Sequence, residues 1–364
     1  MNCLDKRIID TVIDLRHRLH KLAERSGEET ETKACLIKFL SEKTSLRIDD
    51  FGSWFCAVHE ESGCPETIAF RADMDALPCG DGAAHLCGHD GHSAALAGLG
   101  LCLENSKIGR NVVFIFQHAE ENGEGGAVCA RALQKYKVSR VYAYHNIPKW
   151  PEKAVLIKEN TFACASRGMT IFLKGKPSHA AYPEDGHNPG FAAARLISAL
   201  PEICSPALYR GLTMSTLIGA KIGEKAFGSA AGEAEVWVTL RAWYDEDMER
   251  LISGIEKAAE LAAACDGIEV EFSFSGGFPA TINDNETLEK LEAICKNEQL
   301  ECVKVQEPFR WSEDFGHYGA DAKAVMVGIG DGLAWPQLHT QTYEFNDEII
   351  PTVLTLFSAL AGLG

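Results

Sequence analysis

The stretch that decides the fold is CGHDGHSAALAGLGLCLENSKIGRNVVFIFQHAEE, residues 87–121. It starts with a cysteine and two histidines on a glycine-containing turn and continues through the small and apolar run Ser93–Leu103. That run has the length of a helix, whereas Val112–Phe116 is a short apolar run typical of a buried strand. Glu120 and Glu121 follow this strand closely. The stretch therefore predicts a helix and then a strand, with polar residues where the helix begins and where the strand ends.

The same alternation continues on both sides of this stretch. We expect strands at Cys56–His59, Thr67–Ala72, Arg140–Tyr144 and Ala324–Gly328, and helices at Asp5–Leu22, Glu29–Lys43, Ala127–Lys135, Asp284–Asn297 and Glu348–Leu360. Strands that alternate with helices indicate a mostly parallel sheet that helices cover on both faces. The predicted fold class is therefore α/β.

The order of the expected strands and helices changes near Ala165. We expect strands at Met169–Leu173, Thr213–Ala220, Glu235–Ala242 and Ile268–Phe274, and helices at Asn188–Leu200 and Asp245–Ala264. The order β-α-β-β-α-β is the split pattern of ferredoxin-like domains. A chain of 364 residues also exceeds one ordinary core. We therefore predict a first domain of residues 1–164 and 277–364, interrupted by an inserted α+β satellite of residues 165–276.

Composition excludes several classes of protein. The formal net charge of −17 argues against a nucleic-acid partner, because phosphates would be repelled. The sequence has no apolar run long enough to span a membrane, and its charged N-terminus does not resemble a signal peptide. The 13 cysteines have no framework spacing and fit free thiols in a reducing compartment. We therefore expect a cytoplasmic protein without a membrane or nucleic-acid partner.

Three motifs carry residues that bind metals. Cys87 and His89 share one turn, Glu120 and Glu121 follow one predicted strand, and His145 follows another. A lone cysteine or histidine usually has a structural role, but sulfur, imidazole and carboxylate ligands together suit Zn²⁺ and its first-row neighbours. A structural zinc site would more often show C-x-x-C pairs, and the sequence contains none. Either glutamate could bind metal while the other moves protons.

Seven motifs in order resemble one family over most of the chain. They are RHRLHKLAERSGEE (Arg16–Glu29), RADMDALP (Arg71–Pro78), CGHDGH (Cys87–His92), AEE (Ala119–Glu121), GKPSHAAYPEDGHNP (Gly175–Pro189), SEDF (Ser312–Phe315) and LHTQTYEF (Leu338–Phe345). The chain resembles the aminoacylase, hippurate-hydrolase and auxin-conjugate amidohydrolase family of di-metal metallopeptidases. The resemblance implies a zinc-peptidase-like catalytic domain and a ferredoxin-like satellite that acts in dimerisation or as a lid.

The resemblance also implies roles for particular residues. The implied metal ligands are Cys87, which bridges two ions, His89 and His145 on one ion, and Glu121 and His339 on the other. Glu120 resembles the general base and acid, and Asp75 a carboxylate that orients the site. His179 resembles a histidine that reaches the partner protomer's site in a homodimer and stabilises the oxyanion. Arg241 resembles an arginine that grips a substrate carboxylate, although an ordinary surface arginine is an equal alternative.

The expected function is metal-dependent hydrolysis of the amide bond of N-acyl amino acids or small peptides by a metal-activated water, with Glu120 as base and acid. Two divalent ions per subunit are expected, Zn²⁺ foremost, with Mn²⁺, Co²⁺ or Ni²⁺ as alternatives. Dipeptide cleavage, deacylation of another small amide and non-catalytic ligand binding remain open. Two departures concern the substrate: a short stretch between Pro78 and Cys87, and KAFGSAAG (Lys225–Gly232) in place of an asparagine-containing turn.

Overall fold

The computed structural model describes residues 5–363, which fall into two compact units. The first unit contains the chain up to Phe162, Thr281–Pro308 and the segment from Glu313 onward, and the second contains Ala163–Ala280 and Phe309–Ser312. We predicted borders after residues 164 and 276 and placed 309–312 in the first domain. The second unit thus starts and ends a few residues from the predicted borders and includes one additional segment. The functional roles of the two domains stay predictions.

The first unit is built on an eight-stranded sheet with the order β1-β2-β6-β3-β7-β16-β8-β15. Its strands are β1 (Arg47–Asp50), β2 (Phe55–His59), β3 (Thr67–Asp73), β6 (Asn111–Gln117), β7 (Arg140–Pro148), β8 (Val155–Ile157), β15 (Cys302–Lys304) and β16 (Lys323–Gly332). The four central strands β6, β3, β7 and β16 are parallel, whereas β2 and β8 run antiparallel to their neighbours β6 and β16. The predicted mostly parallel sheet is confirmed.

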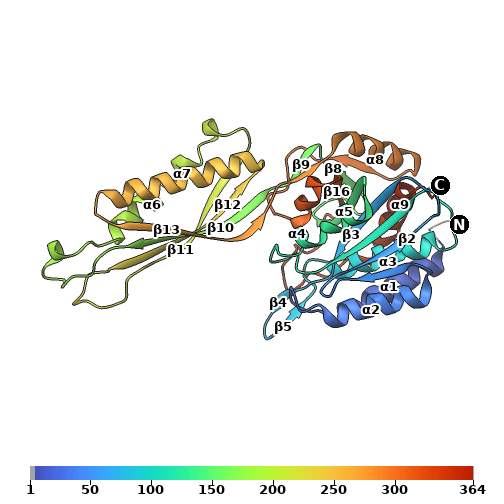
Figure 1. Cartoon of the computed structure of the whole chain (residues 1–364), viewed down its shortest axis with the longest axis horizontal. Helices are drawn as coiled ribbons and strands as arrows, with labels where there is room; N and C mark the ends of the chain where they lie inside the picture. The colour runs from blue at the N-terminus through green and yellow to red at the C-terminus, as the bar shows by residue number, and fades with distance from the viewer. Residues whose placement is uncertain (1–4, 364) are drawn as a thin grey trace. The chain divides into compact units, whose positions relative to one another are not determined.

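Helices cover both faces of this sheet (Figure 1). The side chains of Phe70, Phe114 and Phe116 join one core with the helices α1 (Lys6–His20), α2 (Thr30–Lys43), α3 (His89–Leu103), α8 (Asn285–Asn297) and α9 (Ile350–Ala361). Because side chains alternate along a strand, Arg71, Ile115 and Gln117 point to the opposite face. On that side lie α4 (Gly126–Cys129), α5 (Arg131–Tyr136) and the 3₁₀ helix η3 (Asp314–Ala320). Coverage of both faces explains why β3 and β6 are buried almost throughout.

Small residues allow α3 to lie deep in the first unit. Gly88, directly before the helix, has φ +96°, and a Cβ there would lie 2.5 Å from Asn146 Oδ1. A Cβ on Gly91 would lie 2.3 Å from the ring of Phe345. These close approaches bring the first turn of α3, which carries His89, against the chain that leaves β7.

Several short elements were not predicted. Besides β1, β8, β15 and η3, they are the hairpin of β4 (Leu77–Cys79) and β5 (Gly82–Ala84), the two-stranded pair of β9 (Asn160–Ala163) and β14 (Thr281–Asn283), and the 3₁₀ helices η1 (Pro183–Asp185), η2 (Pro206–Leu208) and η4 (Asp347–Ile349). The hairpin occupies the stretch between Pro78 and Cys87 that the sequence marked as short. Among residues 5–363, no helix combines the length and apolar character that membrane crossing requires.

The second unit is a four-stranded antiparallel sheet with two helices on one face (Figure 1). Its elements in chain order are β10 (Ala165–Lys174), α6 (Gly190–Ile203), β11 (Thr213–Ile222), β12 (Glu233–Ala242), α7 (Asp245–Ala264) and β13 (Glu269–Phe278). The strands lie in the order β11-β12-β10-β13, so β11 and β13 are the edges. Buried residues of β10 and β12, such as Ile171 and Val236, form one core with α6 and α7. The predicted order of helices and strands is thus present.

Candidate metal centre

The candidate ligands gather where the central parallel strands end. Asp73 is the last residue of β3, Glu120 and Glu121 come shortly after β6, and His145 lies in the second half of β7. Since β6, β3 and β7 are parallel neighbours, their carboxyl ends meet at one edge of the sheet. Open α/β sheets place their sites at this edge.

Cys87 stands at the middle of the group. Its side chain is buried, and Sγ lies 3.5 Å from His145 Nε2 and 3.3 Å from His339 Nε2. The ligand atoms of Cys87, His89 and His145 all lie within 4.8 Å of one another, and so do those of Cys87, Glu121 and His339. The five predicted ligands therefore come together as two groups that share one thiol.

Hydrogen bonds turn two of the histidines toward Cys87. His89 Nδ1 lies 3.0 Å from the backbone oxygen of Asp75 and 3.1 Å from Asp75 Oδ1, and His145 Nδ1 lies 2.8 Å from the backbone oxygen of Asn146. Metal-binding histidines usually donate their second nitrogen to a carboxylate or a carbonyl in this way. His145 Nε2 then faces Cys87 Sγ, and His89 Nε2 has no hydrogen-bond partner.

The donor set fits divalent cations. His89 Nε2 and Glu121 Oε1 are buried atoms with no hydrogen-bond partner. Such atoms are rare, and bound cations would satisfy them. Burial also raises the pKa of Glu121 to about 7 and the pKa of the Cys87 thiol well above its usual range. Burial lowers the pKa of His145, which keeps its imidazole neutral. Neutral imidazole is the ligand form, and a nearby cation would favour the ionised carboxylate and thiolate.

Both glutamates face the group. Glu120 Oε2 lies 3.9 Å from His89 Nε2, and Glu121 Oε1 lies 3.7 Å from the same atom. Their other neighbours differ, because Glu121 Oε2 lies 3.9 Å from His339 Nε2, whereas Glu120 Oε1 accepts a hydrogen bond from the backbone N–H of Asp314 at 3.4 Å. Burial, followed by repulsion from Glu313 and Glu121, raises the pKa of Glu120 well above its usual range.

Two residues of the group have left-handed backbones. His339 has φ +63°, and Ala119, directly before Glu120, has φ +51°. The backbone N–H of His339 donates to the carbonyl of Leu86 at 2.8 Å, which ties the C-terminal segment to the Cys87 turn. Non-glycine residues adopt this conformation at a cost, and such strain clusters at functional sites.

Asp75 lies behind the ligands and is fully buried. Besides facing His89, its Oδ2 accepts hydrogen bonds from Ser26 Oγ at 2.7 Å and from the backbone N–H of Glu121 at 2.9 Å. One carboxylate thus connects a histidine of one group with a glutamate of the other. This position agrees with the orienting role that the family resemblance implied.

Several neighbouring residues were not assigned from the sequence. His92 Nδ1 lies 2.6 Å from Asp73 Oδ1, and His92 Nε2 lies 2.5 Å from Asn146 Oδ1. His85 lies two residues before Cys87 in the sequence. Both histidines are buried, but neither ring nitrogen of His85 has a hydrogen-bond partner. For Asp73 the available signal was its place at the carboxyl end of β3.

His179 and Arg241 lie in the second unit. His179 is exposed, and its Nδ1 accepts a hydrogen bond from the backbone N–H of Ala181 at 3.1 Å. Arg241 Nη1 donates to the backbone oxygen of Arg310 and to Ser312 Oγ, each at 2.8 Å. The structure therefore shows which atoms of the second unit contact His179 and Arg241.

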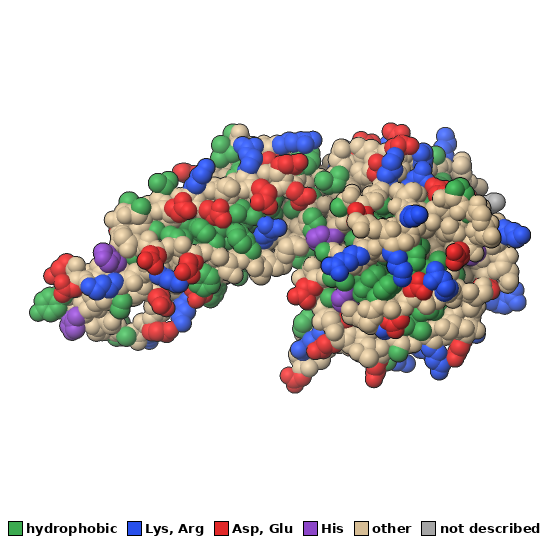
Figure 2. All heavy atoms as spheres, viewed as in Figure 1, with side chains coloured by type: hydrophobic (Ala, Val, Ile, Leu, Met, Phe, Trp, Pro, Cys, Tyr) green, Lys and Arg blue, Asp and Glu red, His purple; other side chains and the backbone are tan. Residues whose placement is uncertain are grey.

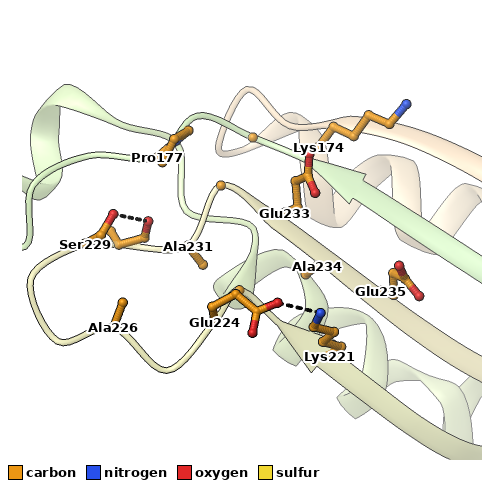
Figure 3. A pocket seen from close by; sticks show the side chains of 14 residues that line it. Lys174, Pro177, Lys221, Glu224, Ala226, Ser229, Ala231, Glu233, Ala234 and Glu235 are labelled. Carbon is orange, nitrogen blue, oxygen red and sulfur yellow. Dashed lines mark hydrogen bonds and ion pairs between the residues drawn. The ribbon is translucent and has the colours of Figure 1, made fainter.

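The substituted turn Lys225–Gly232 packs beside the His179 loop. The backbone N–H of Ala180 donates to the carbonyl of Gly228, and that of Ala230 donates to the carbonyl of Ser178. Figure 3 shows the cavity that this turn borders together with Pro177 and the ends of β10, β11 and β12. Its volume is about 580 Å³. The departure from the family pattern thus forms one wall of a cavity and holds the loop of His179.

Known proteins resemble this chain over nearly its whole length. An uncharacterized hydrolase of *Staphylococcus epidermidis* is 30% identical over 369 residues, which cover 95% of this chain and 96% of that protein. An uncharacterized hydrolase of *Staphylococcus aureus* is 30% identical over 376 residues, which cover 97% of each.

Solved structures share the fold. The *Bacillus subtilis* YXEP protein, described as a dinuclear metal binding peptidase from the M20 family, has a TM-score of 0.84 and 25% identity, with 99% of each chain covered. The aminobenzoyl-glutamate utilization protein of *Klebsiella pneumoniae* has a TM-score of 0.74 at 19% identity, with 98% of this chain and 96% of that chain covered.

The family itself follows from a match to a sequence profile. Residues 69–362, well over half of the chain, match the profile of Peptidase family M20/M25/M40. The matched region contains all five candidate ligands, and the amidohydrolase resemblance that the motifs indicated is confirmed at the level of the family. The chain belongs to Peptidase family M20/M25/M40.

Proposed function

We propose that this protein is a metal-dependent amidohydrolase that cleaves the amide bond of N-acyl amino acids or small peptides. The observation that carries the proposal is the sharing of Cys87 by two groups of potential ligands, with Glu120 beside them. In the proposed arrangement Cys87 bridges two divalent ions, His89 and His145 hold one, and Glu121 and His339 hold the other. The dinuclear character of the *Bacillus subtilis* relative supports this arrangement.

Sulfur, nitrogen and oxygen ligands in one site favour Zn²⁺, and Mn²⁺, Co²⁺ and Ni²⁺ are the alternatives. When bound, the two ions would polarise the substrate carbonyl and lower the pKa of a water molecule. The chain's own contribution is to fix the ligand atoms through Asp75 and the backbone oxygen of Asn146.

Glu120 is the proton carrier of the proposed reaction. Its carboxylate accepts a proton from the attacking water as the water oxygen bonds to the amide carbon. It then delivers that proton to the nitrogen as the carbon–nitrogen bond breaks, so that the amine leaves neutral. Burial and nearby carboxylates raise the pKa of Glu120, which makes its carboxylate a stronger base toward the proton of the attacking water.

His179 is the proposed donor to the developing oxyanion. Because its Nδ1 accepts a backbone N–H, the proton of the neutral ring lies on Nε2, which is then a donor. The family resemblance assigns this histidine to the site of a partner protomer, so we propose a homodimer formed through the satellite. The edge strand β11, with Ile218 and Ile222 about half exposed or more, offers a surface for such pairing.

Arg241 is the proposed anchor for a substrate carboxylate. Nη1 is held by two acceptors, and burial lowers the pKa of the guanidinium, which forms no ion pair with a carboxylate of residues 5–363. Nε and Nη2 would be the donors toward a ligand. A free amino-acid carboxylate is the group that such an arginine would recognise.

Surface charge and cysteine state support a cytoplasmic enzyme for small molecules. On the face drawn in Figure 2, lysine and arginine side chains are interspersed with acidic ones, so this face shows no basic patch for nucleic acid. Cys56, Cys87 and Cys129 are unpaired thiols. Unpaired thiols are typical of a reducing compartment.

A substrate panel tests the proposal. Protein reconstituted separately with Zn²⁺, Mn²⁺, Co²⁺ or Ni²⁺ would be assayed on N-acetyl and N-benzoyl amino acids and on dipeptides. We expect release of free amine from the acyl amino acids, with Glu120→Gln as the inactive control. Preference for dipeptides would support the peptidase alternative. Binding of metal and ligand without turnover by any of the metal forms would reject the enzymatic proposal.

A further inference from the structure

A buried ionic cluster lies directly behind Glu120. We call it the Arg71 cluster, and its members come from β3, β6 and the segment that begins η3. They are Arg71, Asp73, Gln117, Glu313, Asp314 and Tyr318. Every member is at most 2% exposed. The SEDF motif, to which the sequence assigned no chemistry, supplies two of its three carboxylates.

The guanidinium nitrogens of Arg71 contact three carboxylates and one side-chain amide. Nη1 lies 2.7 Å from Asp73 Oδ2, and Nη2 lies 2.8 Å from Glu313 Oε1 and 2.6 Å from Asp314 Oδ1. Nε donates to Gln117 Oε1 at 2.9 Å. One guanidinium therefore orders four side chains from three segments of the chain.

This cation stands beside a group that resembles a metal site. Carboxylate oxygens of Asp73, Glu120 and Glu313 lie within 4.8 Å of one another and are all buried. Such a group of buried acids requires positive charge nearby. Arg71 supplies that charge to Asp73 and Glu313 directly, and within residues 5–363 Arg71 forms no ion pair with Glu120.

Glu120 is connected to the cluster through Asp314. The backbone N–H of Asp314 donates to Glu120 Oε1 at 3.4 Å. The side chain of the same residue accepts from Arg71 Nη2 at 2.6 Å, from Gln117 Nε2 at 2.7 and 2.8 Å, and from the backbone N–H of Gly126 at 2.6 Å. These bonds hold the Asp314 backbone, and with it the donor to Glu120, in one place.

The cluster also has an ordinary structural explanation, since it ties η3 to β3 and β6. That explanation predicts loss of stability on mutation, but it gives no reason for a specific connection with Glu120. Because a misplacement of about 1 Å can cost about 10²-fold in rate, a donor fixed so firmly beside a proton carrier has a functional consequence.

We propose that Asp314, held by Arg71 and Gln117, is a positioning residue that fixes the carboxylate of Glu120 relative to the metal ligands. The inference rests on the proposed role of Glu120. Asp314 touches neither substrate nor ions in this account and acts only through Glu120.

Asp314→Asn tests the proposal because it keeps the side chain's shape and removes its charge. We expect kcat to fall about 10- to 100-fold, with KM and the number of bound ions unchanged. In the Glu120→Gln background the same substitution should change the residual kcat by less than about twofold, since the group through which it acts is already lost. Losses that multiply in the double variant would overturn the inference, and so would an unchanged kcat in Asp314→Asn.

A second readout does not depend on activity. In metal-free protein, the change in Tm caused by Asp314→Asn should differ between the Glu120 and Glu120→Gln backgrounds by about 1 °C or more, because residues in contact are not additive. Additive shifts would overturn the inference even if no substrate is found. Coupled shifts in a protein without hydrolysis would instead reject the proposed function and leave the positioning intact.

Two further variants complete the design. Asp247→Asn is the matched control, because Asp247 is a buried carboxylate of the second unit that accepts backbone N–H groups of Arg210 and Gly211. It should lower Tm without coupling to Glu120→Gln. If Asp314→Asn does not fold, Tyr318→Phe removes only the hydroxyl that donates to Gln117 Oε1 at 2.9 Å. We expect a smaller fall in kcat, again absent in the Glu120→Gln background, and a fall that persists there would contradict the proposal.

Discussion

Cys87 is the residue on which both candidate ligand groups depend. Its thiol lies within 3.5 Å of two histidine nitrogens, and burial alone would keep it protonated. Bound cations would ionise the sulfur and so make it a metal ligand. The proposed binding of two metal ions therefore depends on Cys87 and on its neighbours His145 and His339.

The first prediction concerns this thiol. Purified and reconstituted protein should bind two divalent ions per chain, and Cys87→Ala should lose at least one, because the shared ligand is gone. Elemental analysis after dialysis measures the stoichiometry. Cys56→Ala is the control, since Cys56 is an equally buried cysteine in β2. Two ions retained by Cys87→Ala would remove the bridging thiolate from the account.

The residues that sequence reasoning found and those it missed differ in a physical way. Cys87, Glu120 and Glu121 lie on turns, His89 begins α3, and His145 lies in the second half of β7; at each of these places polar residues interrupt apolar runs and can be recognised. Asp73 and His92 lie beside His89 in the structure. In the sequence, however, nothing distinguishes them from other polar residues of a strand or a helix. His339 lies far along the chain, and only the family resemblance connected it to the others.

At the scale of elements, periodicity predicted the long strands and helices and missed the short ones. β3, β6 and β7 are buried almost throughout, and helices precede β6 and β7, so the parallel arrangement of these strands could be inferred. β8 and β15 have three residues each, too few to show a period. β1 (Arg47–Asp50) is a charged edge strand without an apolar pattern. The register between β16 and β8 depends on contacts distant in sequence and could not be predicted.

One connection between elements gives a prediction about acid stability. Glu61 follows β2 and accepts the backbone N–H groups of Ile108 at 2.5 Å and Gly109 at 3.0 Å, ahead of β6. These bonds, with that from His59, lower the pKa of Glu61 to about 2 from 4.5. A carboxyl with a lowered pKa in the folded state stabilises the fold above pH 4.5, and this contribution is lost as pH falls toward 2.

Glu61→Gln should therefore lower the midpoint of urea unfolding at pH 7, and the difference from wild type should shrink between pH 4.5 and pH 3. Glu60→Gln is the control, because the Glu60 side chain is 69% exposed. A difference that stays constant down to pH 3 would show that the charge of Glu61 does not anchor this loop.

At the scale of the whole molecule, the account requires two chains for one complete site. The resemblance places His179 in the partner's site, and the satellite presents β11 as an exposed edge. His179→Ala and Glu120→Gln chains, each inactive alone, should recover up to about a quarter of full activity when mixed, because one site of a mixed dimer would hold both intact residues. Differently tagged chains would first establish that subunits exchange. No recovery despite exchange would contradict a shared site.

The measurement that tests the central claim most directly is the turnover of Glu120→Gln together with its metal content. Glutamine preserves the shape of the side chain but cannot accept a proton. The account predicts a fall in kcat of about 10²–10⁴-fold, with two ions still bound per chain. A Glu120→Gln protein that remains active, or one that loses its ions, would contradict the assignment of Glu120 as proton carrier and Glu121 as ligand.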